Sequence, residues 1–350
     1  MPTTAPAPKA KNSPAPKATS APIVAATPTR APASVSAGGG VLLFTIGMHI
    51  EPLGATTSAL VSGASKTNGA GQGASYTIAQ IFNNHVKDIQ AVASIVEKHN
   101  GRMTIQAQTP FTTAAIQNKN SILTDLEARG HEIGLHFHED AHLGKNADAL
   151  SVATWCAVLK EEISFIKQTG VKGNIRYWSG GNLYVNLLDA ATCAGLDVNS
   201  DWKNPDIQET DVRLIGIHPW RPAGGTRGTD VSKFATHDPN GKIIFLPEGI
   251  YARSDFASMR RAETAGGDEA YFEFLKQSFN ASLAAAAADK VNVFHFTVHP
   301  AEFKGDVKNP FAVIEKFLTD VVDPQVKAGR VKWATLAEMA DAFKAWEKAR

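Results

Sequence analysis

The chain has 350 residues, 43% of them hydrophobic, which is enough to bury a large core in one big domain or two small ones. Lys and Arg number 35 against 34 Asp and Glu, and this balance excludes a global attraction to nucleic acid, an anionic membrane or an acidic partner. The only cysteines, Cys156 and Cys193, exclude a disulfide-dense scaffold or a four-cysteine zinc site; we expect two inert buried thiols, with one disulfide bridge as the alternative.

The first segment, 1–40, differs in composition from the rest of the chain. It consists mainly of Pro, Ala, Ser, Thr and Lys, which predicts a disordered linker, so one folded domain is expected at 41–350. The linker is not preceded by the apolar core of a signal peptide, and no stretch approaches the ~20 apolar residues of a membrane span. We therefore expect no membrane span. The compartment stays open, although such a linker suits an enzyme tethered at a cell surface.

Beyond the linker, strand and helix patterns alternate along the chain. An apolar run of strand length at 41–50 is followed by a Gly-rich loop at 54–75. In chain order, the patterns then predict helix 76–100, strand 102–109, helix 121–130, strand 131–137, helix 153–170, strand 173–179, helix 186–195, strand 196–201, strand 242–250, helix 270–288, strand 291–299, helix 310–329, strand 331–335 and helix 336–348.

This alternation predicts an α/β fold in which a parallel sheet is covered by helices, either as an open doubly wound sheet or as a closed barrel. With about seven strand and helix units we expect a distorted (β/α) barrel of about seven parallel strands. In both architectures the working residues lie just past the carboxyl ends of the strands. Polar residues occupy such positions after five predicted strands: His49 and Glu51, His136 and His138, Arg176, Asp201, and His299.

The densest group of metal-binding side chains is "GHEIGLHFHEDAH" at 130–142. On a helical turn, His138 and His142 would share one face, and His136 lies on the same side as His138 if the strand persists. At least two of the three should therefore reach a shared point. Imidazoles plus one carboxylate with an open position form the ligand set of a catalytic zinc site, although cobalt, manganese or iron would also fit. The alternative is a solvated charged loop.

These residues carry a resemblance to the polysaccharide deacetylase family, carbohydrate esterase family 4, whose fold is a distorted barrel of strands and helices. The resemblance covers nearly all of 41–350. "GHEIGLHFHEDAH" is similar to the second family motif, "GMHIEP" to the first, "IRYWSGG" to the third, "LDVNSDWKNP" to the fourth and "FTVHP" to the fifth. It implies a divalent metal held by Glu51, His136, His138 and His142, and catalysis by His49, Arg176, Asp201 and His299.

The sequence departs from the family pattern at several positions. His49 stands where the resemblance places an aspartate base, so His49 is either the base or a metal ligand, and in the second case Glu51, Glu139 or Asp140 would be the base. Arg176 then has no anionic base to orient, and we pair it with Asp201 instead. The family spacing of the two metal histidines fits His138 and His142, whereas four residues after His136 the chain has Asp140. Either pair could hold the metal.

The activity implied is metal-assisted hydrolysis of an N-acetyl or O-acetyl group of an acetylated glycan. His299 would donate a proton to the leaving amine or alcohol, and Asp201 or Asp197 would keep its imidazole protonated. His295, on the same side of its strand, either supports the site or packs lower in the barrel. Candidates for stacking against a sugar are the loop aromatics Trp178, Trp202, Trp220 and Tyr251. The same resemblance favours an extracellular or cell-envelope location.

Two other classes of function remain open. One is a carbohydrate-binding protein that keeps this fold and has lost catalysis, which the replaced base makes credible. The other is a metal-dependent glycosidase or peptidase, because "HEDAH" at 138–142 matches the "HExxH" pattern of zinc peptidases. In peptidases that pattern lies inside a long helix, whereas here it is predicted on the turn after a strand.

Overall fold

The strands form a parallel sheet in the order β6-β5-β4-β3-β2-β1-β7, and β8 pairs with Leu42–Phe44 at the start of β1. The computed structural model describes residues 39–50, 60, 76–139, 143–180, 186–200, 210–224, 231–250, 266–300 and 308–350. Within these ranges the strands are β1 Leu42–Ile50, β2 Thr104–Ala107, β3 Glu132–Phe137, β4 Tyr177–Gly180, β5 Val198–Asn199, β6 Ile244–Phe245, β7 Asn292–Val298 and β8 Val331–Trp333.

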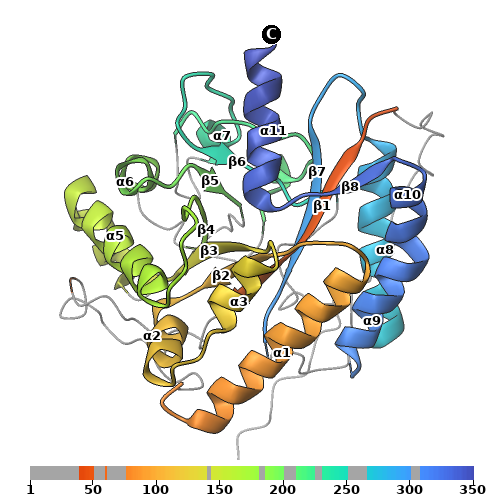
Figure 1. The fold of residues 1–350 in the computed structure, drawn as a ribbon. Helices are drawn as coiled ribbons and strands as arrows, with labels where there is room; N and C mark the ends of the chain where they lie inside the picture. The colour runs from red at the N-terminus through yellow and green to blue at the C-terminus, as the bar shows by residue number, and fades with distance from the viewer. Residues whose placement is uncertain are drawn as a thin grey trace, which may run out of the picture. The chain divides into compact units, whose positions relative to one another are not determined.

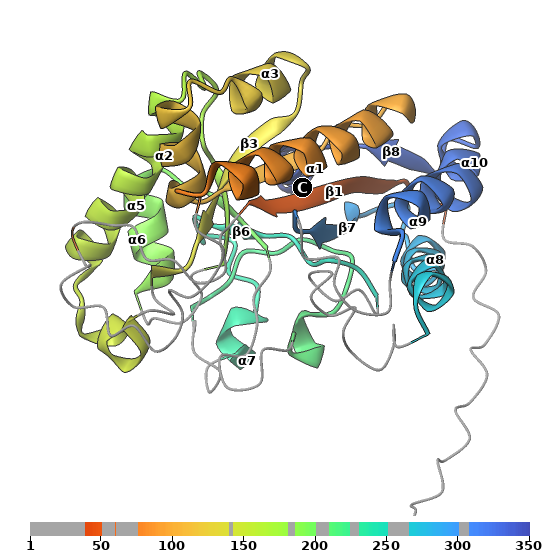
Figure 2. The ribbon, with the colours of Figure 1, turned by 90° about the horizontal axis from the view of Figure 1, so that it is seen from below.

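Helices connect the strands of the sheet (Figure 1). They are α1 Ala79–Lys98, α2 Thr109–Gln117, α3 Ile122–Ala128, α5 Val152–Gln168, α6 Leu187–Ala194, α7 Val231–Phe234, α8 Asp268–Ala284, α9 Pro310–Phe317, α10 Asp323–Lys327 and α11 Leu336–Lys348. Figure 2 shows α1, α2, α5, α8 and α9 in an arc on one side of the strands, with α7 on the other side. None of the described helices combines the length and the hydrophobicity that a membrane span requires.

The sheet curls until its two ends meet. The backbone N–H of His295 in β7 donates to the carbonyl of Glu248, three residues past β6, at 3.2 Å. A distorted (β/α) barrel is therefore confirmed. Apart from its last two residues, the predicted linker 1–40 lies outside the described residues.

The helix pattern differs from the expectation at two places. Helix α2 was not predicted, because the threonines of Thr109–Gln117 favour a strand. Pro110 is compatible with the helix because it lies in the first turn, where a backbone N–H would have no partner within the helix. The predicted helix 310–329 is not one α-helix. It contains a wider π turn at Leu318–Val322 and resumes as α10, with Pro324 in the first turn.

Side-chain alternation along β1 separates an outer apolar face from an inner polar face. Phe44 packs on Phe279 of α8 and Phe317 of α9, with ring centroids 6.0 and 6.3 Å apart, so it faces the helices. Thr45 and His49, which alternate with the outward-facing residues, therefore point into the barrel. Both are buried.

Helix α11 closes the amino end of the barrel. Its residues Leu336, Met339 and Phe343 form one apolar cluster with Tyr177 and Val198, the first residues of β4 and β5. A packed apolar amino end leaves the polar inner residues to the carboxyl end of the barrel. This is where a barrel of this kind carries its functional groups.

The structure corrects the expectation of two free thiols. Cys156 of α5 and Cys193 of α6 form a disulfide with Cα atoms 5.7 Å apart, so the chain has no free cysteine. The two cysteines are 37 positions apart in sequence, and only the side-by-side packing of α5 and α6 brings them together. The sequence alone does not show this packing.

We expect the Cys156→Ala, Cys193→Ala double variant to lose about 3–4 kcal/mol of unfolding free energy, because the disulfide no longer restricts the unfolded chain. Urea unfolding under oxidising conditions measures the loss. Added dithiothreitol should lower the midpoint of the wild type and leave that of the double variant unchanged. Equal midpoints for the oxidised wild type and the double variant would show that the bond contributes nothing to stability.

Glu132, at the start of β3, lies beneath the first turn of α11. Its Oε2 accepts hydrogen bonds from Thr104 Oγ1 at 2.7 Å and from the backbone N–H of Ala337 at 3.0 Å. Burial raises the pKa of its carboxyl to about 7, although these hydrogen bonds and the charge of Arg176 act in the opposite direction. The folded chain therefore binds this proton more tightly than the unfolded chain does.

Stability contributed by Glu132 is accordingly complete below its ordinary pKa of 4.5 and is lost as the pH rises through about 7. Between pH 5 and 8 the loss should be on the order of 1–3 kcal/mol. Glu132→Gln can still accept both hydrogen bonds through one oxygen and cannot ionise. Urea unfolding at pH 5 and pH 8 should therefore show the variant gaining stability relative to the wild type at the higher pH. If the difference in unfolding free energy between variant and wild type is the same at both pH values, the pKa of Glu132 is not raised.

Candidate active site

Three strands bring histidines together at the carboxyl end of the barrel. His49 lies near the end of β1, His136 near the end of β3, and His299 directly follows β7. The ring of His49 stacks on that of His136, with centroids 3.9 Å apart, and meets the edge of His299 at 4.9 Å. All three are buried.

His138 joins this group from the residue just beyond β3. Its Nε2 lies 2.9 Å from Nε2 of His136, and the two rings are perpendicular. Two imidazole nitrogens that each lie roughly 2.0–2.1 Å from one ion are separated by about 3 Å. The pair therefore fits two ligands of one divalent cation, and it equally fits a hydrogen bond when one nitrogen carries a proton.

The remaining predicted ligands are not described. Glu51, Asp140 and His142 lie outside the described residues. Within the described part of the chain, no group of three or more His, Cys, Asp or Glu side chains could hold a metal. The described half of the candidate metal site thus consists of His136 and His138.

Two further side chains extend the histidine group through hydrogen bonds: Ser179 contacts His136, and Gln106 contacts Ser179. Ser179 Oγ of β4 lies 2.7 Å from Nδ1 of His136, and its hydroxyl donates to Oε1 of Gln106 in β2. Neither residue was predicted. The one available signal is the polar Gln106 inside the short strand "TIQA", in register with His49.

Arg176 lies at the opposite end of the barrel. It forms ion pairs with Asp197 at 3.0 Å and with Asp341 of α11 at 2.8 Å. The expectation was wrong because β4 begins at Tyr177, so Arg176 precedes the strand instead of following its core. The structure does not bring Arg176 to the histidines.

Asp197 is likewise not a neighbour of His299 at this site. It precedes β5 and is bonded to Arg176 and Lys344. Although burial alone would raise it, these hydrogen bonds hold the pKa of the Asp197 carboxyl below its ordinary value. Asp201, its alternative as a partner of His299, lies outside the described residues.

Two of the four aromatic candidates for sugar stacking, Trp178 and Trp220, lie among the described residues. Trp178 is completely buried in the core, so it presents no face to a ligand, and that prediction was wrong. Trp220 donates from Nε1 to the carbonyl of Phe234 at 2.7 Å and packs on Phe245, which is the packing of a rim residue. Trp202 and Tyr251 lie outside the described residues.

His295 packs lower in the barrel than His299. Its Nε2 lies 3.3 Å from the carbonyl of Leu246, and the side chain is completely buried. Burial lowers the pKa of its imidazole to about 4, so the ring is neutral at physiological pH. Glu248, by contrast, is a buried carboxyl side chain three residues beyond the end of β6; it lies inside the predicted strand 242–250, and it was not predicted as a site residue.

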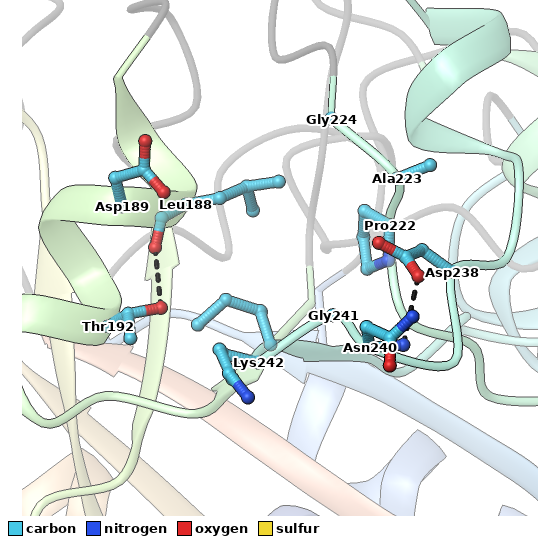
Figure 3. A pocket seen from close by; sticks show the side chains of 11 residues that line it. Leu188, Asp189, Thr192, Pro222, Ala223, Gly224, Asp238, Asn240, Gly241 and Lys242 are labelled. Carbon is cyan, nitrogen blue, oxygen red and sulfur yellow. Dashed lines mark hydrogen bonds between the residues drawn. The ribbon is translucent and has the colours of Figure 1, made fainter.

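A surface cavity of about 350 Å³ lies elsewhere on the barrel, beside α6 and the segment that precedes β6 (Figure 3). Asp189 and Asp238 stand on opposite sides of it, and Thr192 and Asn240 are engaged in local hydrogen bonds. None of its lining residues belongs to the histidine group. This cavity is therefore separate from the candidate active site.

The sequence matches no family model, and no curated protein matches it. In structure, the chain is similar to a Mycobacterium smegmatis protein described as a polysaccharide deacetylase, with a TM-score of 0.55 and 14% identity over 91% of this chain and 94% of that one. A Pseudomonas aeruginosa PAO1 protein of the same description matches with a TM-score of 0.55 and 14% identity, over 87% of this chain and 91% of that one. PuuE allantoinase matches with a TM-score of 0.56 and 14% identity, over 91% of this chain and 95% of that one. At such low identity the similarity establishes the fold alone.

Proposed function

We propose that this chain, which has the fold of polysaccharide deacetylases, is a metal-dependent hydrolase that removes N- or O-acetyl groups from a glycan. The observation that carries the proposal is the group of four imidazoles at the carboxyl end of the barrel, in which the ε nitrogens of His136 and His138 lie 2.9 Å apart. A group of imidazoles of this kind, three of them buried, at the end of the barrel where functional residues lie, is typical of a catalytic metal centre.

His136 and His138 would hold the cation together, and Glu51 and His142 are the proposed additional ligands. Zinc is the first candidate, with cobalt, manganese and iron as alternatives. When bound, the cation polarises the acyl carbonyl and lowers the pKa of a water molecule toward about 7. His136 lies in β3 and His138 directly follows the strand, so the local backbone sets the spacing of these two proposed ligands.

Proton transfer falls to the two remaining histidines. His49 contacts the ring of His136, so it is placed to take a proton from the attacking water. His299 meets His49 from the next strand and is placed to give a proton to the leaving nitrogen or oxygen. The burial of both rings keeps bulk water from competing for these protons.

The disulfide between Cys156 and Cys193 supports an extracellular or cell-envelope location, because such bonds persist in oxidising compartments. A glycan at the cell surface would be within reach there. Trp202 and Tyr251 remain the proposed aromatic contacts to the sugar.

Free acetate is the product that tests this function. The purified protein would be stripped with a chelator, reloaded with zinc, cobalt, manganese or iron, and incubated with N-acetylated chitooligosaccharides and O-acetylated xylan. Allantoin is included as a contrasting substrate, because an allantoinase has a similar fold. We expect acetate release that depends on the added metal. Glycan binding without acetate release would identify an inactive carbohydrate-binding protein, and full activity of the stripped protein would refute the metal mechanism.

A further inference from the structure

We infer that Ser179 and Gln106 are positioning residues that fix which nitrogen of His136 carries its proton. They hold the proton on Nδ1, so that the lone pair of Nε2 faces His138. The consequence for metal binding rests on the proposed function, whereas the position of the proton does not.

The direction of the hydrogen bonds follows from the groups involved. A serine hydroxyl has one proton, and that of Ser179 goes to the amide oxygen of Gln106, which can only accept. Nδ1 of His136 lies 2.7 Å from the same hydroxyl oxygen, so the proton between them must come from the imidazole. A neutral imidazole with its proton on Nδ1 has an unprotonated Nε2, which is the form that binds a metal.

The surrounding strands hold this chain of groups in place. His136 and Ser179 are directly opposite each other in β3 and β4, and Ser179 and Gln106 are fully buried. Gly47 of β1 provides the space for the amide, because a Cβ atom there would lie 2.7 Å from Nε2 of Gln106. Neither Ser179 nor Gln106 can exchange its partner for bulk water.

A reversed amide would have the opposite effect. If the NH₂ group of Gln106 faced Ser179, the hydroxyl would donate to Nδ1 of His136 and the imidazole proton would move to Nε2. That proton would occupy the position of the cation. The acceptor on Gln106 is therefore the group that decides whether His136 is ready to bind a metal.

Nitrogen-15 NMR of the histidine-labelled, metal-free protein reads the proton position directly, with the His136 signals assigned by their loss in His136→Gln. We expect the wild type to carry the proton on Nδ1, and Ser179→Ala and Gln106→Leu to shift the population toward Nε2. In the same variants the affinity for Zn²⁺, measured by competition with a chromophoric chelator, should fall about 10–100-fold. Gln106→Glu keeps an acceptor for Ser179 and should retain the Nδ1 proton.

Thr45→Val is the matched control, because Thr45 is a buried hydroxyl on the inner face of β1 that donates to the carbonyl of Arg102. It should change neither the His136 spectrum nor the Zn²⁺ affinity. The inference is overturned if His136 of the wild type carries its proton on Nε2, or if Ser179→Ala leaves the spectrum unchanged while circular dichroism shows a folded protein. If the wild type releases no acetate but its His136 spectrum depends on Ser179, the proposed function fails and this inference stands.

Discussion

Replacing His136 with alanine should weaken metal binding about 10²–10³-fold, since a four-ligand zinc site contributes roughly 10–16 kcal/mol and one ligand about a quarter of that. Acetate release should fall to background at metal concentrations that saturate the wild type. His138→Ala should cause a loss of the same order, because its ε nitrogen lies 2.9 Å from that of His136 and the two are proposed to bind the same cation. Equilibrium dialysis with metal analysis measures the affinity independently of activity.

His99→Gln provides the control for the general loss of a buried histidine. His99 pairs with Asp323 between α1 and α10 and takes no part in the histidine group. It should lose stability and keep the wild-type metal affinity. If His136→Ala retains metal and activity while His138→Ala loses both, the ligand pair is His138 and His142. If both alanine variants bind metal as the wild type does, the site is not built from β3.

Much of the fold follows from local pattern. Short apolar runs separated by amphipathic helices predict parallel strands with crossover helices, and every predicted strand has a counterpart in the barrel. Strand bounds are less predictable, because the strands at 198–199 and 244–245 are only two residues long. In such short strands the register is set by the neighbouring strands, so the local sequence contains little information about it.

The error at Arg176 shows that an incorrect strand start can assign a residue to the wrong end of the barrel. Placing β4 four residues too early moved Arg176 from the amino end of the barrel to its carboxyl end. Because α11 covers the amino end, the same residue becomes part of an ion-pair network with Asp197 and Asp341. A rule that assigns function by strand end is only as accurate as the strand bounds.

The histidines were more predictable than the residues that support them. His49, His136 and His299 each come at or after the end of an apolar strand, so the rule that functional residues follow strands identifies them one at a time. Ser179 and Gln106 become relevant only when β2, β3 and β4 are in register and their inner faces meet. This information is tertiary, as is the packing of α5 on α6 that joins Cys156 to Cys193.

Replacing His299 with glutamine should lower the turnover of an N-acetylated glycan about 10²–10⁴-fold, the usual contribution of a general acid. Metal affinity should stay unchanged, because the described contact of His299 is with His49 and not with the His136–His138 nitrogens. The loss should be small with an aryl acetate, whose phenolate leaves without protonation, and large with the amide, whose nitrogen cannot leave as an anion.

His49→Gln gives the matched contrast, because a base that activates water is needed for both substrates. It should therefore slow amide and aryl ester hydrolysis to a similar extent, while His299→Gln slows the amide far more than the ester. Equal losses on both substrates in His299→Gln would show that His299 does not protonate the leaving group. A loss of bound metal in that variant would place His299 among the ligands, and the proton donor would then have to be sought on another strand.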